Sequence, residues 1–87
     1  MTVQHEPERS RFVILTGEEE AVLEYEHSGS GVIFTHTFVP PSLRGRGLAE
    51  ELTRTGLEWA RENNLEVGST CSYVSRFLER YPEYRGR

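Results

Sequence analysis

The sequence predicts an α+β domain in which a three-stranded antiparallel sheet is extended by a βαβ unit and a C-terminal helix. Between residues 12 and 39, apolar segments and a segment of alternating apolar and polar residues are separated by turn residues. A segment of helical periodicity follows after a Pro/Gly/Arg loop. A short apolar strand and a second helical segment close the chain. Its 87 residues suffice for one domain. We expect residues 1–9 to form a flexible N-terminal arm and residues 10–87 to form the single domain.

The three antiparallel strands are predicted at residues 12–15, 21–26 and 32–39. The second segment alternates apolar and polar side chains, which is typical of an antiparallel sheet with one face in water. The Ser-Gly-Ser-Gly sequence before the third segment predicts a hairpin connection. His36 is predicted to be in register with Val32, Phe34 and Phe38, so its face of the strand is otherwise apolar.

The βαβ unit is predicted from a helical segment and a short strand that follow the third strand. Residues 48–63 place apolar side chains on one stripe of a helix, and Asn63-Asn64 ends it. Residues 65–70 form the fourth strand, parallel to the third. Ser72 is the predicted N-cap of a final helix, Tyr73 to Tyr81, which ends before Pro82.

Composition excludes several classes of function. All ten basic residues are arginine and all fourteen acidic residues are glutamate, so the net charge is −4, which argues against nucleic acid as a partner. The single cysteine cannot form an intramolecular disulfide and indicates a reducing compartment. No segment is apolar enough to span a membrane, and neither a secretory signal nor metal-ligand spacing is visible. We expect a cytoplasmic monomer or small homo-oligomer.

The loop between the third strand and the first helix carries the strongest functional signal. Two prolines end the strand, and Arg44-Gly45-Arg46-Gly47 leads directly into the helix. A helix N-terminus exposes unpaired N–H groups and the positive end of the helix dipole, and glycines let a bulky anion approach the backbone. The alternative is an ordinary turn in which glycine serves the backbone alone. The loop therefore predicts a site for a phosphorylated cofactor.

The sequence resembles the GNAT acetyltransferase superfamily. Its pyrophosphate-loop pattern (Arg or Gln, two residues, Gly, one residue, Gly or Ala) is met by Arg44, Gly47 and Ala49. The similarity extends to the minimal GNAT-like N-acetyltransferases of under a hundred residues, over about residues 10–84. The matching segments are His36-Thr37, Val39-Pro40, Leu43 to Gly47, Cys71 to Val74 and Tyr81-Pro82-Glu83-Tyr84.

This resemblance implies a GNAT-like fold and an acetyl-CoA site without a metal. Backbone N–H groups of the loop would hold the diphosphate, and the strand end at Phe38 and Val39 would pair with the pantetheine amides. The two parallel strands would splay apart around the thioester, near His36, Thr37 and Cys71. The cofactor-binding residues implied are Phe38, Val39, Arg44, Gly45, Arg46, Gly47, Leu48 and Ala49.

Three residues are candidates for the chemistry, each with a structural alternative. Cys71 precedes a helix whose dipole would favour the thiolate, so it could accept the acetyl group, or it could be a buried apolar residue. His36 suits a general base that deprotonates an amine, or it could be a core histidine. The resemblance implies Tyr73 as the acid that protonates the departing CoA thiolate; alternatively Tyr73 packs on the sheet.

The sequence thus predicts an acetyl-CoA-dependent N-acetyltransferase that acts on an unidentified amine, which a protein could carry. The resemblance also implies an open acceptor site, or one completed by another subunit, because full GNAT domains build that pocket from N-terminal helices and this sequence has only residues 1–10 in their place. The alternative is a non-enzymatic CoA- or acyl-CoA-binding module, or a protein-interaction domain, on a GNAT scaffold.

Overall fold

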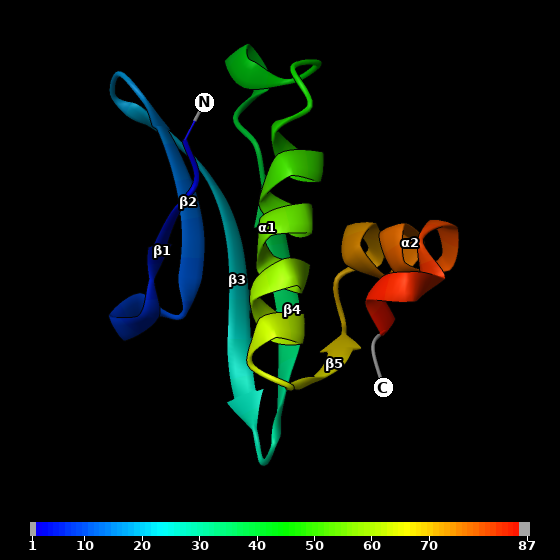
Figure 1. Cartoon of the computed structure of the whole chain (residues 1–87). Helices are drawn as coiled ribbons and strands as arrows, with labels where there is room; N and C mark the ends of the chain where they lie inside the picture. The colour runs from blue at the N-terminus through cyan, green and yellow to red at the C-terminus, as the bar shows by residue number, and fades with distance from the viewer. Residues whose placement is uncertain (1, 86–87) are drawn as a thin grey trace.

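The computed structural model describes residues 2–85 as one mixed sheet with helices packed against it (Figure 1). Met1 and residues 86–87, the ends of the predicted arm and domain, lie outside the described residues. The strand order is β1-β2-β3-β4-β5, with β5 parallel to β4 and the other neighbours antiparallel. The predicted α+β class is confirmed. The strands are β1 Gln4–Glu6, β2 Arg11–Thr16, β3 Glu19–Ser28, β4 Gly31–Phe38 and β5 Glu66–Ser69.

Two α-helices follow the order that the sequence predicts. Helix α1 spans Leu48–Glu62 and connects β4 to β5, and helix α2 spans Ser72–Arg80. Figure 1 shows α1 lying along the sheet and α2 to one side, beyond the end of β5. Short 3₁₀ turns occur at Pro7–Arg9 (η1), Pro41–Leu43 (η2) and Pro82–Arg85 (η3).

The core forms where α1 lies against the sheet. Ala21, Leu23 and Tyr25 share this face, as their alternation predicts, and all three are buried. At Gly56 the helix approaches so closely that a Cβ atom there would lie 2.9 Å from Leu23 Cδ2 and 3.1 Å from Phe34 Cε1. We call this side of the sheet the covered face. Helix α2 and η3 join the same core through Val74, Phe77, Leu78 and Tyr84.

Within residues 1–9, which the sequence predicts as an arm without secondary structure elements, the structure has an edge strand. Gln4 to Glu6 pair with β2 as an antiparallel edge strand. The strand could not be predicted from its polar composition, because the residue that packs it on the sheet is a histidine. His5 stacks on Phe12 with ring centroids 4.2 Å apart. The His5 Nε2 atom also lies 2.6 Å from the Tyr25 hydroxyl. The tertiary contacts of His5 therefore stabilise a strand in a segment whose own sequence pattern predicts a loop.

A β-bulge in β4 overturns the predicted placement of His36. Tyr25 pairs with Phe34 but Glu24 pairs with His36, so Thr35 is an extra residue and the alternation shifts. Phe34 stays in the core, whereas His36 is exposed. His36 therefore lies on the opposite face from Phe34, which we call the open face. The prediction that His36 is in register with Val32 and Phe34 is wrong, whereas His36 does share a face with Phe38.

Helix α2 begins one residue earlier than the sequence predicts. Cys71, with φ −89° and ψ 125°, is the N-cap residue, and Ser72 is the first helical residue. The Cys71 carbonyl accepts hydrogen bonds from the Ser75 N–H and the Ser69 hydroxyl, both at 2.9 Å. These bonds fix the backbone of Cys71 at the junction of β5 and α2.

Candidate functional site

The loop between β4 and α1 leaves the start of the helix open. Gly45 and Gly47 have φ values of +84° and +76°, a region that L side chains rarely adopt. A Cβ atom on either residue would meet no described atom within 4 Å, so the space beside the backbone is free. Gly47 is the N-cap of α1, and no side-chain hydrogen bond caps the helix there. The first N–H groups of α1 therefore face an accessible surface.

A pocket of about 210 Å³ lies over this loop. Six of the eight predicted cofactor-binding residues line it, and Leu43, Glu50 and Tyr73 complete its wall. Arg46 and Phe38 are not among the lining residues; Phe38 instead turns its side chain to the open face, where it is 43% exposed. The six predicted residues are Val39, Arg44, Gly45, Gly47, Leu48 and Ala49.

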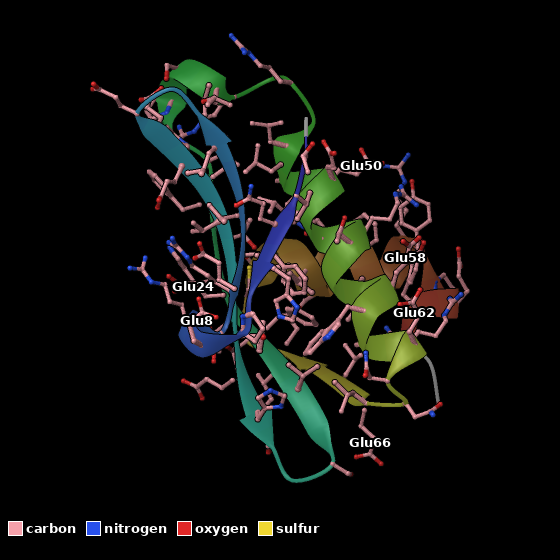
Figure 2. The ribbon with its side chains drawn as sticks, turned by 60° about the vertical axis from the view of Figure 1, so that its left-hand side comes forward. Glu8, Glu24, Glu50, Glu58, Glu62 and Glu66 are labelled. Atoms are coloured by element: carbon pink, nitrogen blue, oxygen red, sulfur yellow. The ribbon has the colours of Figure 1, made fainter. Side chains whose placement is uncertain are left out.

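The charges around this pocket are partly balanced. Arg44 Nε donates a hydrogen bond of 3.0 Å to the Val39 carbonyl, which holds the guanidinium against the loop. Glu50, in the first turn of α1, would repel an anion, but Arg54 Nη2 lies 2.7 Å from its Oε2. Figure 2 shows Glu50 at the N-terminal end of α1, on the other side of the molecule from Glu8 and Glu24. The pair with Arg54 offsets the negative charge of Glu50.

Beyond the pocket, β4 and β5 separate. Their parallel register ends at Phe34 and Ser69, and the Thr70 N–H donates to the Phe34 carbonyl at 3.0 Å. Strand β4 continues to Phe38, so its last residues extend past the end of β5. Thr37 Oγ1 lies 3.3 Å from Cys71 Sγ at this point, and the Cys71 side chain is half-buried. A hydroxyl and a thiol thus meet where the two strands part.

The structure distributes the three predicted catalytic residues over three places. Cys71 lies beside Thr37 at the strand separation. His36 is on the open face, where its ring is nearly parallel to that of Phe38, with centroids 6.5 Å apart. Tyr73 lines the loop pocket with Glu50, and burial, followed by the nearby Glu50 and Tyr81, raises its pKa. Cys71 and His36 therefore approach the strand separation from opposite faces of the sheet.

Sequence reasoning missed the contribution of Glu50 to the pocket. Its signal is the helical spacing itself, because the third helical residue lies on the first turn beside the N-terminus. The bulge at Thr35 had no signal in the sequence pattern. Among residues 2–85, no group of three or more metal-ligating side chains lies together. Neither α-helix of that part of the chain has the length and apolar character of a membrane span.

The sequence matches a known family along nearly the whole chain. The profile of the GCN5-related N-acetyl-transferase family matches residues 11–86. The chain belongs to this family. The fold agrees, because the solution structure of a GCN5-like protein from Staphylococcus aureus superposes with a TM-score of 0.76 and 28% identity, over 97% of this chain and 83% of that one.

Vertebrate relatives align with most of the chain. Protein NATD1 of Bos taurus is 36% identical over 83 residues, which cover 92% of this chain and 74% of the relative. Protein NATD1 of Danio rerio is 34% identical over an alignment of 92 residues, which covers 100% of this chain and 84% of the relative. The shared region includes the loop, the strand separation and α2.

Proposed function

We propose that the protein is an acetyl-CoA-dependent N-acetyltransferase. One observation carries the proposal: an open glycine loop at the start of α1 follows β4, the strand whose Thr37 contacts Cys71. Family membership supports the same reaction class. The diphosphate of CoA would accept hydrogen bonds from the N–H groups of Gly45 to Ala49, with Arg44 adding positive charge.

The path of the pantetheine arm follows from where the sheet is incomplete. The backbone at Phe38, the last residue of β4, and at Val39 extends beyond β5, so its amide groups can pair with the amides of the arm as a further strand would. The thioester would then reach the strand separation beside Thr37 and Cys71. Tyr73, which lines the loop pocket, would contact the cofactor near its diphosphate rather than act as the acid at the thiolate.

The acceptor amine would approach from the open face, because α1 and α2 occupy the other side. His36 is exposed there, on the part of β4 that borders the separation. As a general base it would take a proton from the acceptor nitrogen. The nitrogen attacks the thioester carbonyl carbon, the C–S bond breaks, and the CoA thiolate leaves and takes a proton from solvent or from the Cys71 thiol. The products are the amide and CoA.

A covalent route differs in one step. The Cys71 thiolate would attack the thioester carbonyl carbon, the bond to the CoA sulfur would break, and an acetyl-Cys71 thioester would remain until the amine attacked it. The contact between Cys71 and Thr37 is compatible with either route. Intact mass after incubation with acetyl-CoA separates them, since the covalent route adds one acetyl group that Cys71→Ala abolishes.

Calorimetric titration with acetyl-CoA tests the proposal. We expect saturable one-to-one binding by the wild-type protein, and at least a hundredfold weaker binding by Gly47→Val. Valine is strained at the positive φ of Gly47, and its side chain would fill the space beside the loop. Arg9→Gln is a suitable control, because Arg9 is exposed in η1 at the opposite edge of the sheet. Absence of binding by the folded wild-type protein would contradict the proposal.

Turnover then separates the enzyme from a binding module. The expected result is release of CoA that depends on added amine acceptors, followed with a thiol reagent. Tight binding of acetyl-CoA without turnover across primary amines, peptide N-termini and lysine side chains would favour the non-enzymatic CoA-binding module instead.

A further inference from the structure

We propose that the open face of the sheet binds the acceptor as a polypeptide segment that carries both basic and apolar side chains. This inference rests on the proposed function and specifies its substrate class. A groove of about 590 Å³ lies on this face, lined by the β2–β3 turn, by β3 and β4, and by the prolines that follow β4. We call it the open-face groove. Its volume falls in the range of sites that enclose a ligand of several linked groups, whereas the loop pocket measures about 210 Å³.

Part of the groove wall is apolar. Val22 and Phe38 lie opposite each other in the sheet register, and both line the groove. The Phe38 side chain is 43% exposed, and Pro41, which is also exposed, continues the apolar surface beyond the end of β4. An apolar side chain of a partner would be removed from water on this surface. The groove therefore favours an acceptor that brings apolar side chains as well as an amine.

The rest of the groove wall is acidic. Arg11, the basic residue among the described lining residues, is already bound to two glutamates at 2.6 Å and 3.1 Å. Glu18 and Glu19 also line the groove, and within residues 2–85 neither forms an ion pair. Glu19 accepts a hydrogen bond from the uncharged hydroxyl of Ser42, so its charge is not offset. This negative charge complements lysine and arginine side chains of a partner.

Phe38 connects the groove to the candidate base. Its ring lies nearly parallel to the His36 ring, with centroids 6.5 Å apart. Glu24 pairs with His36 on one side and with Arg11 on the other, so a further carboxylate lies between the base and the groove arginine. A segment in the groove therefore lies next to His36, where its amine would lose a proton. This position makes the occupant the acceptor rather than a partner bound away from the chemistry.

Other occupants complement the groove less well. A second copy of this chain that presented the same face would bring glutamates against glutamates, and the net charge of each copy is −4. A small diamine complements the charge but leaves the apolar surface at Val22 and Phe38 in water. A polypeptide segment with basic and apolar residues complements both parts of the wall.

Acetyl transfer to four acceptors tests the assignment. Three are amidated peptides with free N-termini, Arg-Leu-Lys-Leu-Arg, Gln-Leu-Lys-Leu-Gln and Arg-Gly-Lys-Gly-Arg, and the fourth is the diamine putrescine. We expect the wild-type protein to have a kcat/KM for the first peptide at least about tenfold above that for the glutamine peptide, and about fivefold above that for the glycine peptide. The first difference should shrink as salt concentration rises, because the glutamates are exposed.

Two double variants locate the preference on the protein. Glu18→Gln/Glu19→Gln keeps the side-chain size and should reduce the preference for the arginine over the glutamine peptide to within about threefold, with unchanged affinity for acetyl-CoA. The matched control is Glu62→Gln/Glu79→Gln, which also removes two exposed charges, one from each α-helix. Figure 2 shows Glu62 on α1, on the other side of the molecule from Glu24. The control should keep the full preference.

The outcomes separate this inference from the proposed function. Equal kcat/KM of the wild-type protein for the arginine and glutamine peptides, or an unchanged preference in folded Glu18→Gln/Glu19→Gln, would overturn the groove assignment while leaving acetyl transfer established. A higher kcat/KM for putrescine than for every peptide would overturn the polypeptide class in favour of a small polyamine. Transfer to none of the four would also overturn the assignment, and calorimetry with acetyl-CoA would then show whether the proposed function fails with it. The wild-type comparison needs no variant, so a folding defect cannot obscure it.

Discussion

The two faces of the sheet are made by alternate residues of the same strands, yet they are used differently. On the covered face, Phe12, Leu23 and Phe34 are almost completely buried under α1. On the open face, Leu15 is 52% exposed and Phe38 is 43% exposed. Arg11 forms ion pairs with Glu6 and Glu20 across this second face. The second face also holds the buried Val13 and Val22, so it is accessible only in part, at side chains such as Leu15 and Phe38.

The difference matters because the β-bulge exchanges residues between the two faces. Before Thr35, the residues of β4 that point to the covered face are Val32 and Phe34. After Thr35, the residue on that side is Thr37, which contacts Cys71. Without the extra residue, His36 would enter the core side and Thr37 would leave it. The bulge thus leaves a histidine accessible to a partner on one face and a hydroxyl beside the thiol on the other.

The largest effect should come from exchanging the candidate base on the open face. We expect His36→Gln to lower kcat by about a hundredfold or more, because a general base contributes 10²–10⁴-fold, and to leave acetyl-CoA affinity unchanged. Steady-state kinetics together with calorimetry measure both quantities.

The matched variant on the other face is Cys71→Ala, for which we expect less than about a fivefold loss of kcat if transfer is direct. The reverse order of the two effects, accompanied by an acetylated wild-type protein, would establish the covalent route. It would also transfer the chemistry from the open face to the covered face.

The free energy of unfolding should depend more on the covered face than on the open face, whereas activity should depend more on the open face. Gly56→Val places side-chain atoms where even a Cβ lies within 3.1 Å of Leu23 and Phe34, so we expect a loss of about 2–3 kcal/mol of unfolding free energy. Phe38→Ala, on the open face, removes a ring that is 43% exposed and should cost less, about 1 kcal/mol. Urea denaturation of both variants measures the contrast, and comparable losses would mean that the Phe38 ring contributes as much to stability as the packing around Gly56.

The sequence predicted the structural features that depend on local pattern, but it did not predict those that depend on contacts between residues far apart in the chain. Alternation predicted the covered face at Ala21, Leu23 and Tyr25, and the glycines predicted the open loop. The strand at Gln4–Glu6 depends on His5 reaching Phe12 and Tyr25, contacts that no local pattern encodes. The bulge at Thr35 is likewise a property of strand pairing rather than of composition, and it separates His36 from Cys71.

A smaller effect on stability is expected at Thr53, a buried residue of α1. Its side chain is fully buried, and its Oγ1 atom has no hydrogen-bond partner in the described part of the chain. Thr53→Val keeps the shape and removes an unsatisfied hydroxyl, so we expect a gain of about 1 kcal/mol in unfolding free energy. Urea denaturation measures it. A loss of stability would show that the hydroxyl has a partner, such as an internal water.

The smallest expected effect is a change of stability with pH at His5, on the edge strand β1 of the covered face. Burial lowers the pKa of His5 below its ordinary value of 6.5, and nearby His27 acts in the same direction while Glu8 opposes both. Below pH 6.5 the unfolded chain therefore binds a proton that the folded chain resists, so stability falls as pH falls through that range. We expect a loss below roughly 1 kcal/mol, because the ring is only partly buried.

Hydrogen exchange at the β1–β2 pairing should detect this loss, with faster exchange at pH 5.5 than at pH 7. His5→Gln is the control, since glutamine can retain a hydrogen bond to Tyr25 but does not titrate. In that variant the exchange, corrected for its intrinsic pH dependence, should be the same at both pH values. An equal pH response in both proteins would assign the effect to another group. It would also imply that β1 is held by its backbone pairing rather than by the histidine that joins it to the covered face.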